Sequence, residues 1–308
     1  MAEYSIGVDL GGTNLRAAAV DRSGMILDRV SGSTQLSAGR DAVISDIVAS
    51  ILRLRADRPS EQLAGIGIGV PGFIIMEKGI ISMSPNLHFF ENFPIRDEIE
   101  RLLQTPVLLE NDANVAALGE KWIGAGRDVE DLVLLTLGTG VGGGIICGGK
   151  VLHGFVGMAG ELGHMTVVPG GNPCNCGNDG CLEKHASATA ITAWARMLGL
   201  GDNLSSKEVY DLAAGGNQRA RVCFEQMGDA LGMALASLVN IFNFPLYLLS
   251  GGVLGAWDLF TPSMFAVLKR RSLTFRRTET RIDKAVLGSD AGLYGAAYLP
   301  FQARTTNP

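Results

Sequence analysis

Three of the five cysteines in this chain fall within the ten residues from Cys174 to Glu183. His164 stands ten residues before the first of them, at the end of the phrase GELGH. Glu161 and Glu183 lie on the same segment. A metal bound here would fix the backbone that carries these two carboxylate hydrogen-bond acceptors. One histidine and three cysteines make a tetrahedral ligand set for zinc, and the candidate ligands are His164, Cys174, Cys176 and Cys181.

Three glycine-rich turns follow predicted strands, in DLGGTN (residues 9–14), LGTGVGGG (137–144) and SGGV (250–253). A strand that ends in glycines exposes backbone N–H groups, and without Cβ atoms the chain can approach a phosphate closely. The alternative for each turn alone is a tight hairpin. Their matching places in the chain favour phosphate binding, with Asp9 placed to hold Mg²⁺. The candidate residues are Asp9, Gly11, Gly12, Thr13, Asn14, Gly138, Thr139, Gly140, Gly251 and Gly252.

Two familiar nucleotide-binding motifs fit this sequence only in part. Gly138, Gly140 and Gly143 satisfy GxGxxG after a strand, but the dinucleotide fingerprint needs a helix next, and GGGIICGGK reads as a strand. The segment 144–150 resembles a P-loop, yet Val151 stands where Ser or Thr would hold magnesium. We therefore exclude both motifs.

A strand-to-helix junction in the segment 105–120 places Asn111 and Asp112 directly after an apolar run. Either side chain would make a good helix N-cap, which is the purely structural interpretation. The functional interpretation is a general base, because an aspartate at the carboxyl end of a strand beside a cleft can take a proton from a substrate hydroxyl. Phosphoryl transfer needs mainly positioning and one such carboxylate. The sequence leaves both interpretations open.

The elements that must position these groups recur in two halves of the chain. The first half reads as strands over residues 4–10, 15–20 and 25–30, a helix with apolar residues recurring over 43–52, and a strand over 64–70. The second half repeats that order, with strands over 131–138, 143–149 and from 150 onward, a helix around 231–239, and a strand over 245–253. The repetition predicts a duplicated α/β unit with a cleft between the copies.

The composition is that of an ordinary globular protein, with 308 residues of which 47% are hydrophobic and 19% are charged. The net charge of −5 argues against an extended nucleic-acid-binding surface. No segment reaches the run of about 18 apolar residues that a membrane span needs, and the first residues lack a basic region followed by an apolar run. We therefore expect neither membrane insertion nor secretion.

The remaining cysteines and histidines lie outside these motifs. The number of cysteines is odd and three of the five are concentrated in one segment, which in a chain without a signal peptide favours metal binding over disulfides. Cys147 and Cys223 stand in apolar surroundings, and we predict that both are buried, unreactive thiols. His88 stands beside two phenylalanines and is predicted to pack against them or to line a cleft. We assign no role to His153 or His185.

Together these motifs resemble those of the ROK (repressor, open reading frame, kinase) family of sugar kinases, within the hexokinase–actin superfamily. DLGGTN resembles the first phosphate motif, LGTGVGGG the second, and SGGV the adenosine-side turn. ENDAN (110–114) resembles the catalytic motif, and GELGH with CNCGNDGCLE resembles the family signature and zinc motif. Each glycine turn alone is weak evidence, but the joint order spans almost the whole chain and is highly specific.

The resemblance implies an α/β fold of two lobes, hexokinase–actin-like (ribonuclease H-like), with duplicated units of a strand meander and a helix. The small lobe would span residues 1–112 with a C-terminal helix at 291–308, and the large lobe would span residues 113–290 with the zinc-binding loop. ATP and sugar would bind in the cleft between the lobes.

The activity implied is ATP-dependent phosphorylation of a hexose, with glucose as the favoured substrate and glucose 6-phosphate as the product. Asp112 would be the general base that activates the sugar 6-OH. The cofactors implied are ATP, Mg²⁺ and a zinc that is structural, because four protein ligands leave no open position for an activated water. The implied protein is a cytoplasmic homodimer of carbohydrate metabolism that binds neither nucleic acid nor membrane. The sugar-binding residues implied are Asn86, Asn111, Asp112, Glu161, His164 and Glu183.

Three alternatives accompany this interpretation. The substrate could be another hexose (fructose, mannose, allose or an N-acetylated amino sugar), because one hydrogen bond can decide between sugars that share their other contacts. The chain could be a non-catalytic, sugar-responsive regulator, although Asp9 leaves no room before it for the DNA-binding extension of repressors in this family. A nucleic-acid-binding zinc knuckle is disfavoured by the acidic charge and by the absence of Lys and Arg between the cysteines.

Overall fold

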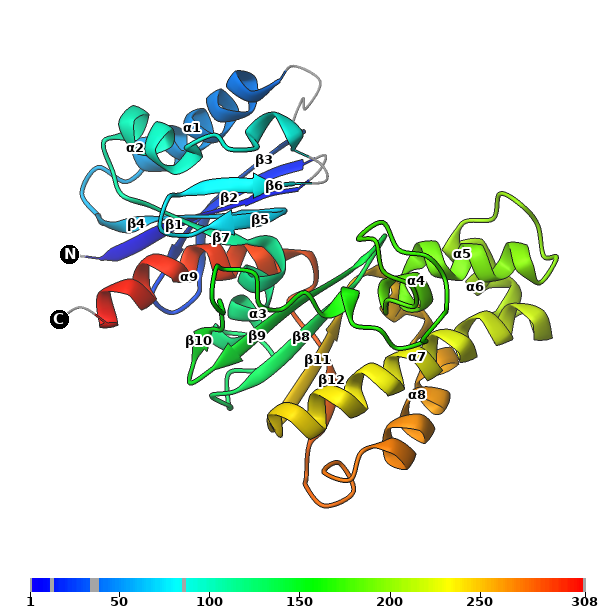
Figure 1. The fold of residues 1–308 in the computed structure, drawn as a ribbon. Helices are drawn as coiled ribbons and strands as arrows, with labels where there is room; N and C mark the ends of the chain where they lie inside the picture. Colours follow the sequence, from blue (N-terminus) through cyan, green and yellow to red (C-terminus); the bar gives the residue numbers. More distant parts are fainter. Residues whose placement is uncertain (1, 12–13, 34–38, 85–86, 307–308) are drawn as a thin grey trace. The chain divides into compact units, whose positions relative to one another are not determined.

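Figure 1 shows a computed structural model of the chain, which describes residues 2–11, 14–33, 39–84 and 87–306. The chain divides into two units. Unit 1 comprises residues 1–130, 144–160 and 286–308, and unit 2 comprises residues 131–143 and 161–285. This division differs from the predicted boundaries at residues 112 and 290, because α3 (Asp112–Trp122) packs along the C-terminal helix α9 (Ala291–Thr306) within unit 1.

Unit 1 is built on a five-stranded sheet with the order β3-β2-β1-β4-β7. The first three strands form the predicted antiparallel meander, whereas β4 and β7 run parallel to β1. The carboxyl ends of β1, β4 and β7 therefore lie at one edge of the sheet. The strands are β1 (Glu3–Leu10), β2 (Asn14–Asp21), β3 (Ile26–Ser33), β4 (Gln62–Val70) and β7 (Val107–Asn111).

Helices cover both faces of this sheet, because successive side chains of a strand point to opposite faces. Ile6 of β1 points to the face covered by α1 (Arg40–Ala56), where it is buried in one apolar cluster with Ile47. Gly7 points to the opposite face, where a Cβ atom would lie 2.5 Å from the backbone oxygen of Leu293 in α9. Glycine at this position allows the helix to lie directly on the sheet.

Helices α3 and α9 also approach each other through glycines. A Cβ atom on Gly295 of α9 would lie 1.7 Å from the backbone oxygen of Val115, and one on Gly119 of α3 would lie 2.2 Å from that of Ala291. This close packing fixes α3, the helix that begins at Asp112, against α9 within unit 1.

Smaller elements of unit 1 lie between β4 and β7 in the chain. They are the hairpin of β5 (Phe73–Ile75) and β6 (Ile80–Met83), the 3-10 turn η2 (His88–Phe90) and α2 (Ile95–Leu103). Of the two roles predicted for His88, packing against the phenylalanines is wrong, since its side chain is 75% exposed, while a place in a cleft wall stays a prediction. Its ring Nδ1 instead lies 3.2 Å from Oε1 of Glu91, because the 3-10 turn directs the ring outward while Phe90 is buried.

A second five-stranded sheet has the order β10-β9-β8-β11-β12. β11 runs parallel to β8 and β12, and β10 runs antiparallel to β9. The order and directions repeat those of the first sheet, which confirms the predicted duplicated α/β fold. The strands are β8 (Leu132–Leu137), β9 (Val141–Cys147), β10 (Lys150–Val151), β11 (Leu246–Ser250) and β12 (Arg281–Lys284).

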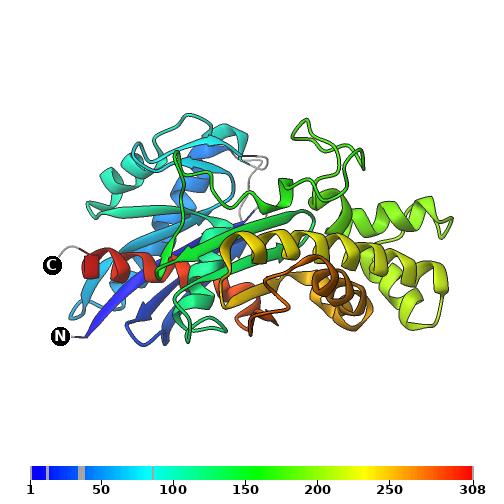
Figure 2. The ribbon, with the colours of Figure 1, turned by 60° about the horizontal axis from the view of Figure 1, so that its bottom comes forward.

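The long helix α7 (Gln218–Phe242) organises the helical part of unit 2. It packs on α8 (Trp257–Arg271), as Figures 1 and 2 show, and Gly228 allows this approach because a Cβ there would lie 2.2 Å from the backbone oxygen of Phe260. By length and composition α7 could cross a membrane, but its most apolar stretch is 67% buried, as expected of a core helix. Unit 2 also contains η3 (Leu162–His164), α4 (Glu183–Ala186), α5 (Ala188–Met197), α6 (Ser206–Ala214) and η4 (Gly252–Ala256).

The two cysteines outside the cluster differ from each other. Cys223 is fully buried in α7, as predicted. The prediction of a buried Cys147 is wrong, because its thiol is exposed. Cys147 ends β9 and pairs with Lys150 of the two-residue strand β10, at the edge of the sheet, where an apolar neighbourhood in sequence does not produce burial.

Candidate active site

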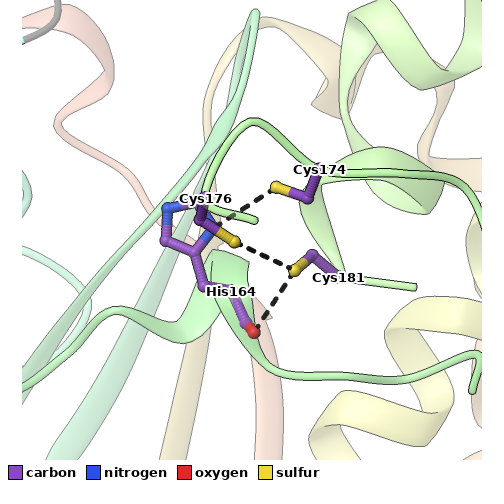
Figure 3. A group of neighbouring side chains, drawn as sticks. All are labelled: His164, Cys174, Cys176 and Cys181. Atoms are coloured by element: carbon purple, nitrogen blue, oxygen red, sulfur yellow. Dashed lines mark hydrogen bonds between the residues drawn. The ribbon is translucent and has the colours of Figure 1, made fainter. Parts of the chain in front are cut away.

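The four predicted metal ligands come together in unit 2, on a loop that folds back on itself (Figure 3). The ligand atoms of His164 and the three cysteines all lie within 4.8 Å of one another. Cys174 Sγ lies 3.6 Å from Nδ1 of His164, and Cys176 Sγ lies 3.6 Å from Sγ of Cys181. The loop returns because the N–H of Cys174 donates to the Asn178 oxygen and the N–H of Gly177 donates to the Cys174 oxygen.

This arrangement fits a tetrahedral zinc ion. Zinc–sulfur bonds of about 2.3 Å at tetrahedral angles separate two sulfur atoms by about 3.8 Å, close to the spacing of the Cys176 and Cys181 thiols. The set is soft and contains no carboxylate, which is the chemistry of a closed structural site. Burial raises the pKa of the Cys181 thiol to about 12, so this sulfur needs a cation beside it to become a thiolate.

The imidazole of His164 joins this cluster to the predicted sugar-binding carboxylates. Its Nδ1 faces Cys174, and its Nε2 lies 3.9 Å from Oε2 of Glu161. Burial raises the pKa of the Glu161 carboxyl; His164 opposes this shift, and the like charge of Glu183 adds to it. Glu161, His164 and Glu183 therefore form one polar group within unit 2, two of whose members sit at the start of short helical turns.

The second glycine turn is attached to the same group. Oε2 of Glu183 accepts from the N–H of Val141 at 3.2 Å. The N–H of Gly138 donates to the Gly140 oxygen, and the hydroxyl of Thr189 in α5 donates to the Thr139 oxygen at 2.7 Å. These bonds hold the carbonyl groups of the turn, while Thr139 itself is exposed.

The third glycine turn borders a cavity of about 250 Å³ in unit 2. Gly251 has φ of 100°, and a Cβ on it would lie 2.2 Å from the backbone oxygen of Leu137, so the turn lies directly on the strand that leads into the second turn. The cavity is lined mainly by apolar side chains and backbone, with one cation. Its lining residues are Ile191, Ser206, Lys207, Tyr210, Phe224, Gly252, Val253, Gly255 and Ala256.

In unit 1, the junction of β7 and α3 separates the two interpretations of Asn111 and Asp112. Asn111 is the N-cap of α3, with its Oδ1 accepting from the N–H groups of Ala113 and Asn114 at 2.9 and 3.2 Å. Its Nδ2 donates to the Gly72 oxygen at 3.1 Å. Asn111 is the N-cap, and Asp112 is the first helical residue and is exposed. Oδ1 of Asp112 also accepts from the N–H of Ala113 at 2.9 Å, so the two side chains share this donor.

Asp9 lies at the same sheet edge as this junction. Asp9 of β1 pairs in register with Gly69 of β4, and Gly69 pairs in turn with Glu110 of β7, one residue before Asn111. The side chain of Asp9 is 11% exposed, and its carboxylate forms an ion pair with Arg16. Burial raises the pKa of Asp9, and the guanidinium of Arg16 counters that shift.

A model of the ROK family matches residues 5–303. The chain belongs to the ROK family. A glucokinase of Thermotoga maritima is 39% identical over 306 residues, which cover 95% of this chain and 95% of that protein. The crystal structure of a ROK hexokinase from Thermus thermophilus is similar with a TM-score of 0.88 and 33% identity, covering 99% of this chain and 100% of that one.

A second solved structure adds information on ligands. A ROK family glucokinase from Streptomyces griseus, solved in complex with glucose and AMPPNP, is similar with a TM-score of 0.77 and 33% identity over 97% of this chain and 99% of that one. The coverage of both chains means that the similarity extends over the whole ROK fold rather than over one unit.

The predicted residues of this ROK chain thus divide between its units. Unit 1 contains Asn111 and Asp112 with Asp9, Gly11 and Asn14 of the first turn, in which the Gly11 N–H donates to the Asn14 oxygen at 2.9 Å. Unit 2 contains the metal ligands, both carboxylates and the candidate phosphate-binding residues of the other two turns, which are Gly138, Thr139, Gly140, Gly251 and Gly252. Gly12, Thr13 and Asn86 lie outside the described residues.

One polar pair in unit 1 escaped the sequence analysis of this ROK protein. Nε2 of His153 lies 2.6 Å from Oε2 of Glu110, a carboxylate whose side chain is only 2% exposed. The hydrogen bond to Glu110 raises the pKa of His153, although desolvation opposes it. A glutamate buried at the end of an apolar strand needs a polar partner, and Glu110 after the apolar residues of β7 is a sequence signal for such a partner. The partner is 43 residues away in the chain, so local spacing could not identify it.

Proposed function

We propose that this ROK protein transfers the γ-phosphoryl group of ATP to glucose and forms glucose 6-phosphate. The observation that carries the proposal is the exposed position of Asp112 on the first turn of α3, directly after the N-cap Asn111 and at the carboxyl end of β7. The glucokinase relative and the solved glucokinase complex with glucose and AMPPNP, an ATP analogue, support both the sugar and the donor.

In the reaction, Asp112 accepts the proton of the sugar 6-OH while that oxygen forms a bond to the γ-phosphorus. The bond between this phosphorus and the bridging oxygen of the β-phosphate breaks, and ADP leaves with the electron pair. The first turn of a helix is a favourable place for a carboxylate, because the positive end of the helix dipole faces it. Asn111 retains one amide hydrogen beyond its bond to Gly72, and this hydrogen is available for a sugar hydroxyl.

The other sugar contacts would come from unit 2. Glu161 and Glu183 offer carboxylate oxygens that accept from sugar hydroxyls, and His164 offers Nε2 on the side away from the cysteines. Asn86, by resemblance, completes this set. Charged acceptors that bind hydroxyls strongly discriminate against a sugar that lacks one of those hydroxyls, since the unpaired acceptor loses a charge-assisted bond.

ATP would occupy the glycine turns and the cavity beside the third turn. The exposed Thr139 and the backbone N–H groups of the turns suit the phosphates, and Asp9 suits Mg²⁺. The cavity at Gly252 and Gly255 is apolar with Ser206 at its wall, which is the chemistry of a nucleobase site.

We propose zinc as the structural metal, held by His164, Cys174, Cys176 and Cys181. The ion would supply no acid–base chemistry, because its coordination sphere is filled by protein, and would fix the ring of His164 through Nδ1. The proposal of a cytoplasmic homodimer rests on the family resemblance alone.

A coupled assay of ADP release over glucose, mannose, fructose, allose and N-acetylated amino sugars tests this function. We expect the highest kcat/KM with glucose. A higher value with another sugar would reassign the substrate within the same chemistry. Sugar binding by calorimetry without ADP release from any of the five classes would favour the second candidate, a sugar-responsive regulator.

A further inference from the structure

We propose that Glu110 and His153 form a positioning pair that fixes the carboxylate of Asp112 for catalysis. The inference depends on the proposed kinase function, because it assigns a role in that reaction. Neither residue needs to contact the substrate. The pair is 2.6 Å apart between His153 Nε2 and Glu110 Oε2, and both residues belong to unit 1.

Glu110 is the centre of a small buried network. Its Oε1 accepts from the N–H of Asn111 at 2.9 Å and from Nδ2 of Asn114 at 2.9 Å. Its Oε2 is left for His153. A carboxylate that is 2% exposed is strongly disfavoured without charge-assisted partners, so these three donors and the acceptor stabilise one arrangement together.

Two of the three donors belong to the turn that presents Asp112. The N–H of Asn111 immediately precedes Asp112 in the chain, and Asn114 lies on the first turn of α3. The side chain of Asn111 is fixed as well, by its cap bonds and its bond to the Gly72 oxygen. Glu110 therefore holds the backbone N–H directly before Asp112 and the side chain of Asn114 two residues after it.

His153 supplies the third donor from a different part of unit 1. Its own backbone oxygen accepts from the N–H of Ala159 at 3.1 Å and closes the loop 153–159. Glycine with φ of 69° at Gly154 begins this loop, and a Cβ there would lie 3.0 Å from that of Ala159. His153 therefore joins Glu110 to a closed loop within unit 1.

A purely structural pair and a positioning pair make different predictions. If the pair only stabilised unit 1, its loss would lower the melting temperature and leave the turnover of folded enzyme unchanged. If it positions Asp112, its loss lowers kcat in enzyme that is still folded, because a displacement of about 1 Å at a reacting group reduces rates by about 10²-fold. The two outcomes can be distinguished with variants of His153 whose side chains differ only in how far a hydrogen-bond donor extends from the backbone.

The test compares His153→Gln with His153→Asn in the full-length protein. The amide nitrogen of Gln reaches the place of the imidazole Nε2, whereas that of Asn is one methylene short. We expect H153N to lower kcat by about 10–100-fold with the KM for MgATP within about twofold, and H153Q to recover kcat to within about threefold of wild type. Ile47→Val, a core change in α1, is the matched control, with a lower melting temperature and an unchanged kcat.

The proposal is overturned if H153N keeps the wild-type kcat whatever its melting temperature, or if H153Q and H153N lose kcat equally. The activity of the wild-type protein distinguishes failure of the positioning proposal from failure of the proposed kinase function. A wild-type protein that releases no ADP with any hexose overturns the function and the pair with it, whereas an active wild type and an active H153N overturn the pair alone.

Discussion

The Glu183 carboxylate accepts a hydrogen bond from the N–H of Val141 at 3.2 Å. This bond connects a predicted sugar-binding residue directly to the second glycine turn, within unit 2. A Cβ atom on Gly140 would lie 2.3 Å from Oε2 of the same carboxylate. The absence of a side chain at Gly140 is therefore explained by the approach of Glu183. The turn therefore has a structural role beside the phosphate binding that we propose for it.

This contact predicts that Gly140→Ala displaces the Glu183 carboxylate. We expect the KM for glucose to rise by about tenfold, since a charge-assisted hydrogen bond to the sugar is weakened, with little change in melting temperature. Steady-state kinetics with varied glucose gives the measurement. Gly32→Ala in β3, where a Cβ meets nothing within 4 Å, is the control and should behave as wild type. Equal KM values in the two variants would contradict the interpretation.

Replacing Asp112 by Asn removes the base and keeps the shape of the side chain. We expect kcat to fall by about 10²–10⁴-fold, the range typical of a positioned general base, while the Kd for glucose by calorimetry changes by less than about threefold. Asp57→Asn, the same chemical change at an exposed residue of unit 1, is the control. Retention of more than about a tenth of wild-type turnover would exclude Asp112 as the base.

The cavity beside the third glycine turn predicts a selective effect on the nucleotide. Gly255 lines the cavity, and a Cβ on it meets nothing within 4 Å, so Gly255→Leu directs a side chain into the open space. We expect the KM for ATP to rise by about tenfold or more and the Kd for glucose to stay unchanged. Gly255→Ala controls for the backbone, since one methyl leaves most of the cavity open. If both variants keep the wild-type KM for ATP, the adenine base of ATP does not bind in this cavity.

The strands that carry the glycine turns could be predicted from the sequence, because apolar runs that end in glycine are local signals. The structure confirms the meander and the repeated strand order on that basis. The pair of Glu110 and His153 could not be predicted, because the pairing of residues 43 positions apart in the chain leaves no periodic pattern.

The division of labour between Asn111 and Asp112 shows a similar limit. Both residue types are good N-caps. Which of the two side chains caps α3 depends on whether the helix begins at residue 112 or 113, and sequence patterns do not define a helix start that closely. In the structure Asn111 is the N-cap and accepts from both Ala113 and Asn114, while Asp112 shares only the N–H of Ala113. Cys147 was mistaken for a buried residue because its neighbours are apolar, whereas its place at the end of β9 determines its exposure.

The pair of Glu110 and His153 predicts how stability depends on pH. Its hydrogen bond raises the pKa of His153 in the folded state above the unfolded value of about 6.5. The contribution of the charged pair is therefore complete below about pH 6.5 and is lost as pH rises through the folded-state pKa. We expect the difference in melting temperature between wild type and H153Q to be largest near pH 6 and to shrink by about pH 9. A difference that is constant or grows with pH would contradict a protonated His153.

The cysteine cluster predicts one zinc ion per chain and predicts that loss of a cluster thiol lowers zinc content, whereas loss of a thiol outside the cluster does not. Cys176→Ser removes one of four ligands, so we expect mass spectrometry of the metal content to show substoichiometric zinc. The melting temperature should fall by about 5 °C or more, because metal binding is coupled to folding of the loop. The KM for glucose should rise in the same variant, since His164 loses the bond that orients its ring toward Glu161. Cys147→Ser, an exposed thiol outside the cluster, is the control and should keep its zinc, its melting temperature and its KM. If C176S keeps a full zinc complement and a wild-type KM, the four residues are not a metal site that supports sugar binding.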